Sequence, residues 1–493
     1  MKRPDHASPC SLLLPARLLP ALLLSIWSCL LWGSMTAWAQ EASNADERIG
    51  RLEEDLRVLH QRNEDLEEEL HSIRQTLENV EDDDLEDPQQ QSIESKNPAL
   101  PPQQQAPVPA SQQERHLYTG FHLTTEDGRH GLWLGGRITG RFTAFLTDHP
   151  LHNEFSVERG RLFANARLFD HYSLRIQVEF SPKPTLKDAF LDVHYVPWLR
   201  FRLGQFKAPF SLEYQQSHKY IDFAERSIAV DNMRLAGRDI GAMFHGRLVR
   251  PAFQYQLAVL SGKGENRGDD NSAKDLAGRL VFRPFYTGAN EILRGAQLGV
   301  SATWGKQDTD FSDFQLVTVA GTPFVSFSDG TNLSGNRTRL GAEFAWFVGP
   351  ASLKAEWMWM WLYDFRMPPL REDFRLHSWY VSASYLLTGE KKLPGRIIPK
   401  RPFRPWKGRR EWGAWELAAR YSRYHTDEDL FRLGMASGTS RAGAVTTALS
   451  WYLNQLFRVT LHYEHTEFRD DIVVDGDVLD DEDALLVQCQ LEF

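Results

Sequence analysis

From about residue 131 to residue 493, apolar and polar side chains alternate along the chain with a period of two. In the stretch GRLFANARLF, Leu162 and Ala164 fall on one face, whereas Arg161 and Arg167 fall on the other. This period is typical of a β-strand that has one face in an apolar medium and the other in water. The pattern constrains the fold more than any other feature of the sequence, and it predicts an all-β architecture.

Sixteen segments carry this pattern. We expect strands near residues 131–146, 155–169, 171–180, 186–196, 198–206, 238–249, 251–261, 274–284, 294–305, 338–348, 350–361, 375–388, 412–424, 442–453, 456–468 and 482–493. After the first strand, most of the gaps between them alternate between long and short; the long ones include 207–237, 306–337, 362–374, 425–441 and 469–481. Long loops at one end and tight turns at the other are typical of an outer-membrane barrel. The gap 389–411 is an exception, since it should be a short turn and is long and basic.

These features predict a 16-stranded antiparallel transmembrane β-barrel over residues 116–493. A secreted soluble β protein is the alternative, but it needs a second sheet or a helix to cover the apolar face, and no helical pattern occurs among the strands. A mean hydropathy of −0.44 excludes a helical membrane protein without excluding a barrel, which exposes only every second residue to lipid. The closing segment ALLVQCQLEF is expected to pair with the first strand and remove the free edge of the sheet.

The N-terminal part of the sequence predicts three different segments. Residues 1–39 combine a basic start, an apolar run and an Ala-Trp-Ala cleavage pattern, which indicates a signal peptide; an uncleaved anchor is the alternative. Residues 41–81 carry a heptad repeat and predict an α-helical coiled coil, with a single amphipathic helix as the alternative. Residues 82–115 are acidic and then rich in Pro and Gln, so we expect a disordered linker. The heptad positions a and d are held by Ile49, Leu52, Leu56, Leu59, Asn63, Leu66, Leu70, Ile73, Leu77 and Val80.

Charge and cysteine content narrow the classes of function. The formal net charge is −10, but residues 1–115 hold 10 basic and 21 acidic residues, which leaves 46 and 45 for the barrel region. Of those 46 basic residues, 34 are arginine. Two of the three cysteines, Cys10 and Cys29, lie in the leader, so Cys489 remains alone and neither a disulfide within the chain nor a cysteine-based metal site is expected.

Several stretches resemble the phosphate-selective porin O and P family over about residues 131–493. The matching segments are LKDAFLDVHY (186–195), GQFKAPFSLEYQQSHKYIDFAERS (204–227), GRDIGAMFHG (237–246), YLLTGE (385–390), GAWELAARYSRY (413–424) and SWYLNQLFRVTLHYEHTEF (450–468). The resemblance implies a trimeric outer-membrane channel for anions such as phosphate or polyphosphate. It also implies that the third extracellular loop, here 207–237, folds into the lumen. Some members of the family carry an N-terminal coiled coil, which would lie in the periplasm.

In a channel, the charges that line the lumen set the selectivity. Alternation places eight arginines on the polar face of the first five strands, namely Arg137, Arg141, Arg159, Arg161, Arg167, Arg175, Arg200 and Arg202. In the loop, Lys207, Lys219, Arg226 and Arg234 are the candidates for a constriction. Arginine suits phosphate because its planar fork binds two oxygens and stays charged. The alternative is that Glu158, Glu179, Asp188 and Asp192 neutralise these arginines as structural ion pairs.

Other functions have weaker support in the sequence. GTSRAG (438–443) lacks the second glycine of a nucleophile elbow, and HYEH (462–465) does not form a zinc motif. We therefore expect no catalytic residues, cofactor or metal, although a membrane-embedded hydrolase with distant Ser and His residues stays open. The basic segment 391–410 joins two strands, so contact with anionic lipid or partner subunits is expected rather than nucleic acid. Alternatives to the anion channel are a tether between the outer membrane and peptidoglycan, with the barrel as anchor, and a general or sugar porin.

Overall fold

The computed structural model describes residues 120–233, 237–249, 252–268, 272–288, 290–312, 314–406 and 411–493. The predicted signal peptide, coiled coil and linker lie outside the described residues. Among the residues that are described, no helix is both long and apolar enough to cross a membrane.

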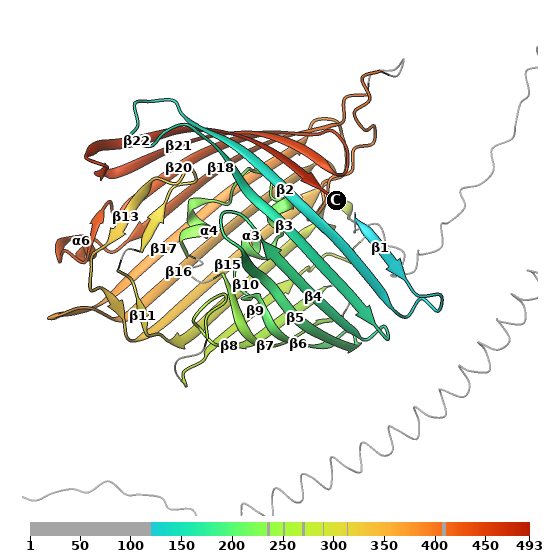
Figure 1. Cartoon of the computed structure of the whole chain (residues 1–493), viewed down its shortest axis with the longest axis horizontal. Coiled ribbons are helices and arrows are strands. Elements are labelled where there is room, and N and C mark those ends of the chain that lie inside the picture. Colours follow the sequence, from blue (N-terminus) through green and yellow to red (C-terminus); the bar gives the residue numbers. More distant parts are fainter. Residues whose placement is uncertain are drawn as a thin grey trace, which may run out of the picture. The chain divides into compact units, whose positions relative to one another are not determined.

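Sixteen antiparallel strands form a closed barrel within the described residues, as the alternation predicts. Every strand pairs with the next, and the last pairs with the first, so that Leu491 of the last strand lies opposite Ile138 of the first. Figure 1 shows β22 beside β2, where the barrel closes. The strands are β2 (Gly131–Phe145), β3 (Glu154–Leu168), β4 (Tyr172–Glu179), β5 (Thr185–Val196), β6 (Leu199–Lys207), β7 (Arg238–Leu248), β8 (Phe253–Leu260), β9 (Asp275–Phe282), β10 (Ala296–Lys306), β15 (Asn336–Val348), β16 (Ala351–Met367), β17 (Leu370–Leu386), β18 (Ala414–Thr426), β20 (Arg441–Tyr452), β21 (Phe457–Val474) and β22 (Asp477–Glu492).

The period-two pattern sorts the side chains between lipid and lumen. Along β22, Leu486, Gln488, Gln490 and Glu492 are buried in the lumen, whereas the outward Leu491 is 41% exposed. Outward apolar side chains recur on every barrel strand. They are exposed on the protein surface, and the hydrocarbon of the membrane covers them, which is favourable for apolar groups. The same alternation carries polar side chains into the interior, where the functional groups lie.

Two gaps expected to be long loops are extended hairpins instead. β16 and β17 extend into the stretch 362–374 and meet at a turn at Pro368 and Pro369. β21 and β22 extend into the stretch 469–481 and meet at a turn at Asp475 and Gly476. Bulges interrupt the register of both hairpins, between Leu362 and Phe365 in β16 and between Glu467 and Ile472 in β21. The bulges disturb the alternation that the sequence reading relied on. A short strand that the sequence did not indicate, β1 (Phe121–Thr124), pairs with the start of β2.

The long loops lie at one end of the barrel, which we take as extracellular. They fill one side of the lumen with apolar side chains. A small sheet of β12 (Gln315–Val317), β13 (Pro323–Phe327) and β19 (Ala436–Gly438) contributes to this cluster. Inward residues of the wall, such as Met358 and Phe374, pack against it, each at most 2% exposed. The other short elements are α5 (Glu291–Arg294), β11 (Thr309–Asp310), β14 (Asn332–Leu333) and α6 (Asp429–Arg432).

Candidate functional site

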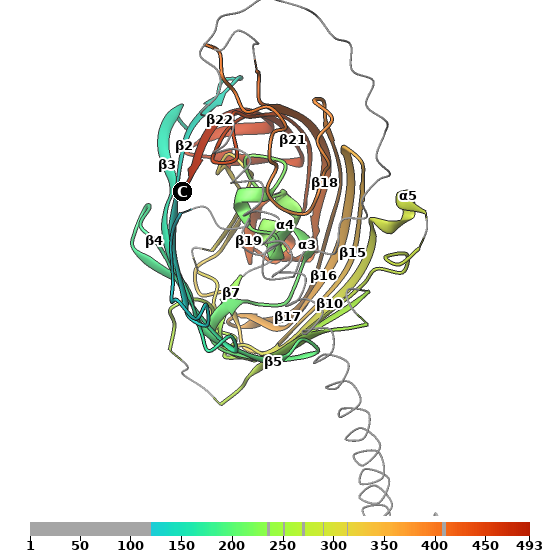
Figure 2. The same ribbon diagram turned by 90° about the vertical axis from the view of Figure 1, so that its right-hand side faces the viewer.

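The loop between β6 and β7, described over residues 208–233 and 237, lies inside the ring of strands and is called the inward loop. It contains α3 (Leu212–Gln215), η1 (His218–Tyr220) and α4 (Ile228–Met233). Figure 2 shows α3 and α4 within the barrel, viewed from one end. Four apolar residues of this loop are almost fully buried: Ile221, Phe223, Ile228 and Met233 are at most 2% exposed. The loop is therefore a packed part of the interior.

The inward loop is fastened to the far wall of the barrel by polar contacts. The carboxylate of Glu356 on β16 accepts hydrogen bonds from the backbone N–H groups of Leu212 and Glu213, at 2.8 and 2.7 Å. The buried guanidinium of Arg420 on β18 lies 3.3 Å from Glu213. Arg458 on β21 donates to the carbonyl of Ile221 at 2.8 Å. These contacts hold the loop against β16–β21 and leave space on the side of β2–β7.

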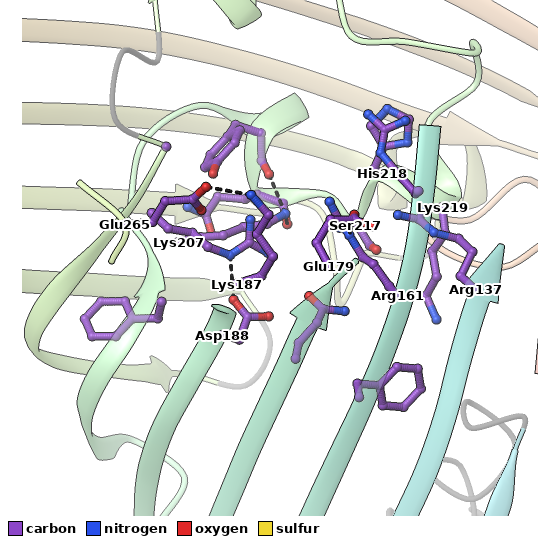
Figure 3. A pocket seen from close by; sticks show the side chains of 18 of the residues that line it. Arg137, Arg161, Glu179, Lys187, Asp188, Lys207, Ser217, His218, Lys219 and Glu265 are labelled. Carbon is purple, nitrogen blue, oxygen red and sulfur yellow. Dashed lines mark hydrogen bonds and ion pairs between the residues drawn. The ribbon is translucent and has the colours of Figure 1, made fainter. Parts of the chain in front are cut away.

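A cavity of about 780 Å³ occupies that space, between the inward loop and strands β2–β7. Its described lining contains ten Lys and Arg side chains and seven Asp and Glu side chains, so the balance is locally positive. Figure 3 shows Lys219 and His218 of the loop close to Arg137 and Arg161 of the wall. Five of the eight predicted wall arginines line the cavity, and Arg141, Arg167 and Arg200 do not.

Seven of the eight predicted arginines form ion pairs. The acids proposed as structural partners in the sequence are present in this role: Glu158, Glu179, Asp188 and Asp192. Asp192 accepts from both Arg200 and Arg202 at 2.8 Å. Glu225 of the inward loop, which the sequence reading did not single out, lies 2.5 Å from Arg141 and 2.8 Å from Arg159. The remaining pairs are Arg161–Glu179, Arg167–Asp170 and Arg175–Asp188.

Arg137 is the eighth arginine and differs from the others. It is 5% exposed, and within the described residues no carboxylate lies within 4 Å of it. Its Nη1 atom is buried and has no hydrogen-bond partner there. The register places it directly opposite Arg161, and like charges in that position repel each other. A buried, unsatisfied guanidinium beside a second arginine is a site that an anion would stabilise.

The four candidates in the loop have different surroundings. Lys207 donates to the carbonyls of Tyr214, Gln215 and Gln216 at 2.7, 3.3 and 3.0 Å, so its three protons serve the end of α3. Lys219 lines the cavity and pairs with Glu492 on the last strand. Arg226 lines the cavity and donates to the carbonyls of Glu213 and Gln216, at 3.3 Å each. Arg234 lies outside the described residues.

Glu225 is the acidic centre of the cavity. Burial alone would raise the pKa of this carboxyl, but Arg159, His218 and Arg141 together hold it well below its usual range. Burial, with help from Arg159, lowers the pKa of His218 well below its usual value. At neutral pH the loop therefore presents a charged carboxylate and a neutral imidazole, and the two are joined at 2.6 Å.

Lys392 and Arg396 of the basic segment reach into the barrel from the short-turn end, which the sequence did not indicate. Lys392 is 3% exposed and pairs with Glu416 on β18 and with Asp222 of the inward loop, the latter at 2.8 Å. Arg396 pairs with Glu492. Burial opposes the charge on Asp222, but Lys354 and Lys392 outweigh it and lower the pKa of this carboxyl. These two residues brace the inward loop, and contact of the rest of segment 391–410 with anionic lipid or partner subunits stays a prediction.

Residues 135–493 match the profile of the phosphate-selective porin O and P family. The chain belongs to this family. It is therefore an outer-membrane porin, a member of a family of channels rather than of enzymes. No curated protein matches the chain.

Solved structures of outer-membrane proteins are similar to this porin at low sequence identity. OmpT of Vibrio cholerae is 8% identical, and the match covers 75% of this chain and 99% of OmpT with a TM-score of 0.49. An anion-selective porin from Comamonas acidovorans is 12% identical, with 74% and 100% covered and a TM-score of 0.46. The outer membrane channel DcaP of Acinetobacter baumannii is 12% identical, with 76% and 100% covered and a TM-score of 0.47.

Proposed function

We propose that the protein is a passive channel for anions and that phosphate or a chain of phosphates is its preferred solute. The observation that carries this proposal is Arg137, a buried guanidinium with an unsatisfied Nη1 atom in a cavity whose basic side chains outnumber its acidic ones. Membership of a family described as phosphate-selective supports the same substrate class. Arg161 and Lys219 complete the basic side of the cavity near Arg137.

The paired arginines have a second role in this proposal. Arg159, Arg161 and Arg175 each keep one carboxylate partner, so the lumen is not uniformly positive. An anion that enters the cavity exchanges hydrating water molecules for guanidinium donors. The ion pairs between these arginines and their carboxylates stay intact when it binds. Binding that is favourable but not too tight is what a conducting site needs.

The first prediction concerns ion selectivity in planar bilayers. With a tenfold KCl gradient, we expect the wild-type reversal potential to have the sign of an anion channel. Arg137→Gln should weaken the block of chloride current by added phosphate about tenfold or more, because a charge-assisted hydrogen bond contributes about 1.5–3 kcal/mol. Arg167→Gln is the matched control, since Arg167 is paired with Asp170 and does not line the cavity.

Cation selectivity of the wild-type channel would overturn the proposal. An equal phosphate block in Arg137→Gln and the wild type would remove Arg137 from the permeation path. A loss of the same size in Arg167→Gln would show that the effect comes from net charge and not from the cavity.

A second candidate function has one observation in its favour. The apolar cluster in the lumen, which includes Phe311, Phe324 and Leu430, fits a barrel that serves as an anchor for the N-terminal segments. The anchor reading predicts no channel events in bilayers and capture of peptidoglycan by the full-length chain. Channel events that are closed by phosphate would decide for the porin reading.

We further propose that the porin works as a homotrimer. OmpT, whose structure includes a trimer form, has the same kind of barrel. On this chain, the outward rings of Phe142 and Phe155 lie 4.5 Å apart on the first two barrel strands, and Phe155 is 85% exposed. Native mass spectrometry of the purified protein in mild detergent tests this proposal, and a monomer mass alone would contradict it.

A further inference from the structure

A basic cluster lies on the outer surface of the barrel, far from the lumen. It consists of His377 on β17, Arg423 and His425 on β18, and Arg441 on β20. The register sets His377 opposite His425, and His425 opposite Arg441, so that these three form one row across three adjacent strands. Arg423 lies in the next row and points outward as well, since the intervening Tyr424 is buried in the lumen. The four side chains therefore lie on the same outer face of the barrel as the apolar side chains that contact lipid.

The two guanidinium groups of this cluster lack acidic partners within the described residues. Neither guanidinium has a carboxylate within 4 Å there, and Nδ1 of His425 is buried without a hydrogen-bond partner. Glu467 lies across Gly443 from Arg423 in the register, but it pairs with His465 at 3.8 Å. In the lumen, by contrast, seven of the eight predicted arginines are paired with acids. An unmatched basic cluster on an apolar surface therefore requires a separate explanation.

The cluster borders a shallow cavity of about 300 Å³ that is lined by the four residues and by Trp379. The rings of Trp357 and Trp379 lie 6.0 Å apart, and those of Trp379 and Tyr421 lie 5.4 Å apart. Val381 and Val445, on the side of this aromatic row away from the long loops, are 43% and 46% exposed. Aromatic girdles mark the boundary between hydrocarbon and headgroups. The cluster thus lies at the level of the headgroups in the outer leaflet.

We propose that this cluster binds the phosphate group of an anionic lipid in the outer leaflet. Two guanidinium groups supply forked donors for phosphate oxygens, and the two imidazoles supply further hydrogen bonds. The neighbouring Trp379, Tyr421 and Val445 offer an apolar surface for an acyl chain. Free phosphate has no apolar part that could contact that surface, whereas a lipid has one. The apolar surface therefore favours a lipid as the occupant.

The test uses the purified full-length protein in a neutral detergent, with binding measured by native mass spectrometry. The probes are a bis-phosphorylated glucosamine disaccharide lipid and the same glycolipid with its phosphates removed. We expect the wild type to bind the phosphorylated lipid about tenfold more tightly. The double variant R423Q/R441Q should lose this preference. R401Q/R432Q should keep it, because it removes two exposed arginines elsewhere.

Three results would overturn the proposal: equal binding of both lipids by the wild type, an unchanged preference in R423Q/R441Q, or displacement of the lipid by an equal concentration of inorganic phosphate. Dissociation of the oligomer in R423Q/R441Q, with the lipid preference intact, would instead assign the cluster to a protein interface. R423K/R441K keeps both charges and tests the same point if the glutamine variant does not fold. It should retain most of the preference, and its bilayer conductance and that of R423Q/R441Q should equal the wild-type value.

Discussion

At the scale of single residues, the role of an arginine in this lumen depends on its partner rather than on its place on a strand. Alternation identifies the strand face, and the eight predicted arginines do carry their charge toward the lumen side. Their roles differ because Asp192 holds two of them, Glu225 holds two others, and Arg137 is left without a carboxylate among the described residues. Charge balance in the lumen is therefore local, as the near equality of basic and acidic residues suggests.

Arg420 gives the sharpest prediction for stability at this scale. Its guanidinium is fully buried between Glu213 of the inward loop and Glu464 of the wall, at 3.3 and 3.4 Å. Arg420→Met should destabilise the packed loop by about 3–5 kcal/mol, because two buried carboxylates lose their counter-charge. The expected readout is faster cleavage of the loop by protease in detergent. Arg432→Gln, which breaks an exposed pair, should behave like the wild type.

The sequence could identify the faces of the strands but not these partners. Glu225 and Asp222 lie within the stretch that resembles the porin family, yet nothing in their spacing shows which wall residues they meet. The partner depends on the path of the inward loop, and packing against distant strands determines that path. For the same reason the sequence could not show that Lys207, which lines the cavity as a constriction residue would, also donates to carbonyls at the end of α3.

At the scale of elements, two loops from opposite ends of the barrel meet inside it. The inward loop comes from the end with long loops, and the segment that contains Lys392 comes from the end with tight turns. Asp222 joins them, since it accepts from Lys392 and from Lys354 at 2.8 Å each. The length and charge of 389–411 were visible in the sequence, but its entry into the lumen was not. A turn can enter a barrel only where the interior leaves it room, and spacing carries no information about that.

Loosening this junction should change the channel. Asp222→Asn removes the charge that both lysines share, so we expect a larger and noisier single-channel conductance at pH 7. Asp308→Asn is the control, because Asp308 forms no ion pair with described residues. A conductance of Asp222→Asn identical to that of the wild type would show that the junction does not limit the path.

The pH dependence of the same junction follows from the lowered pKa of Asp222. A carboxyl with a lowered pKa in the folded state adds stability above its ordinary pKa, and that stability is lost as the pH falls through the folded value. The wild-type conductance should therefore stay level from neutral pH down to about 4 and change only below that. Asp222→Asn should show no such acid transition. A transition near pH 6 would point to another group.

At the scale of the whole molecule, the barrel has a packed side and an open side. The apolar cluster and the loop contacts lie against β16–β21, whereas the basic cavity lies against β2–β7. The number of strands, their order and the closure of the barrel could be predicted from alternation and gap lengths. The asymmetry of the interior could not, because inward apolar residues such as Met358 and Phe374 look like ordinary exceptions to alternation in the sequence.

Closure of the barrel depends on two glycines at the seam. A Cβ atom on Gly136 would lie 2.4 Å from the ring of Phe493, and one on Gly135 would lie 2.6 Å from its carbonyl oxygen. The backbone N–H of Gly136 donates to that oxygen at 2.9 Å. Gly136→Val should therefore reduce the folded fraction seen by heat-modifiable migration on gels. Gly268→Val is the control, since no heavy atom lies within 4 Å of a Cβ atom there and the backbone φ is not in the left-handed region; equal folding of the two variants would contradict this role of the seam.

The inward loop also touches the strand that closes the barrel. Glu492 at the end of β22 binds Lys219 of the loop and Arg396 of the opposite turn, and Gln490 accompanies it by donating to the carbonyl of Lys219 at 3.3 Å. The last strand is therefore joined both to the first strand and to the contents of the lumen. A change in the path of the inward loop would disturb the same residues that close the barrel.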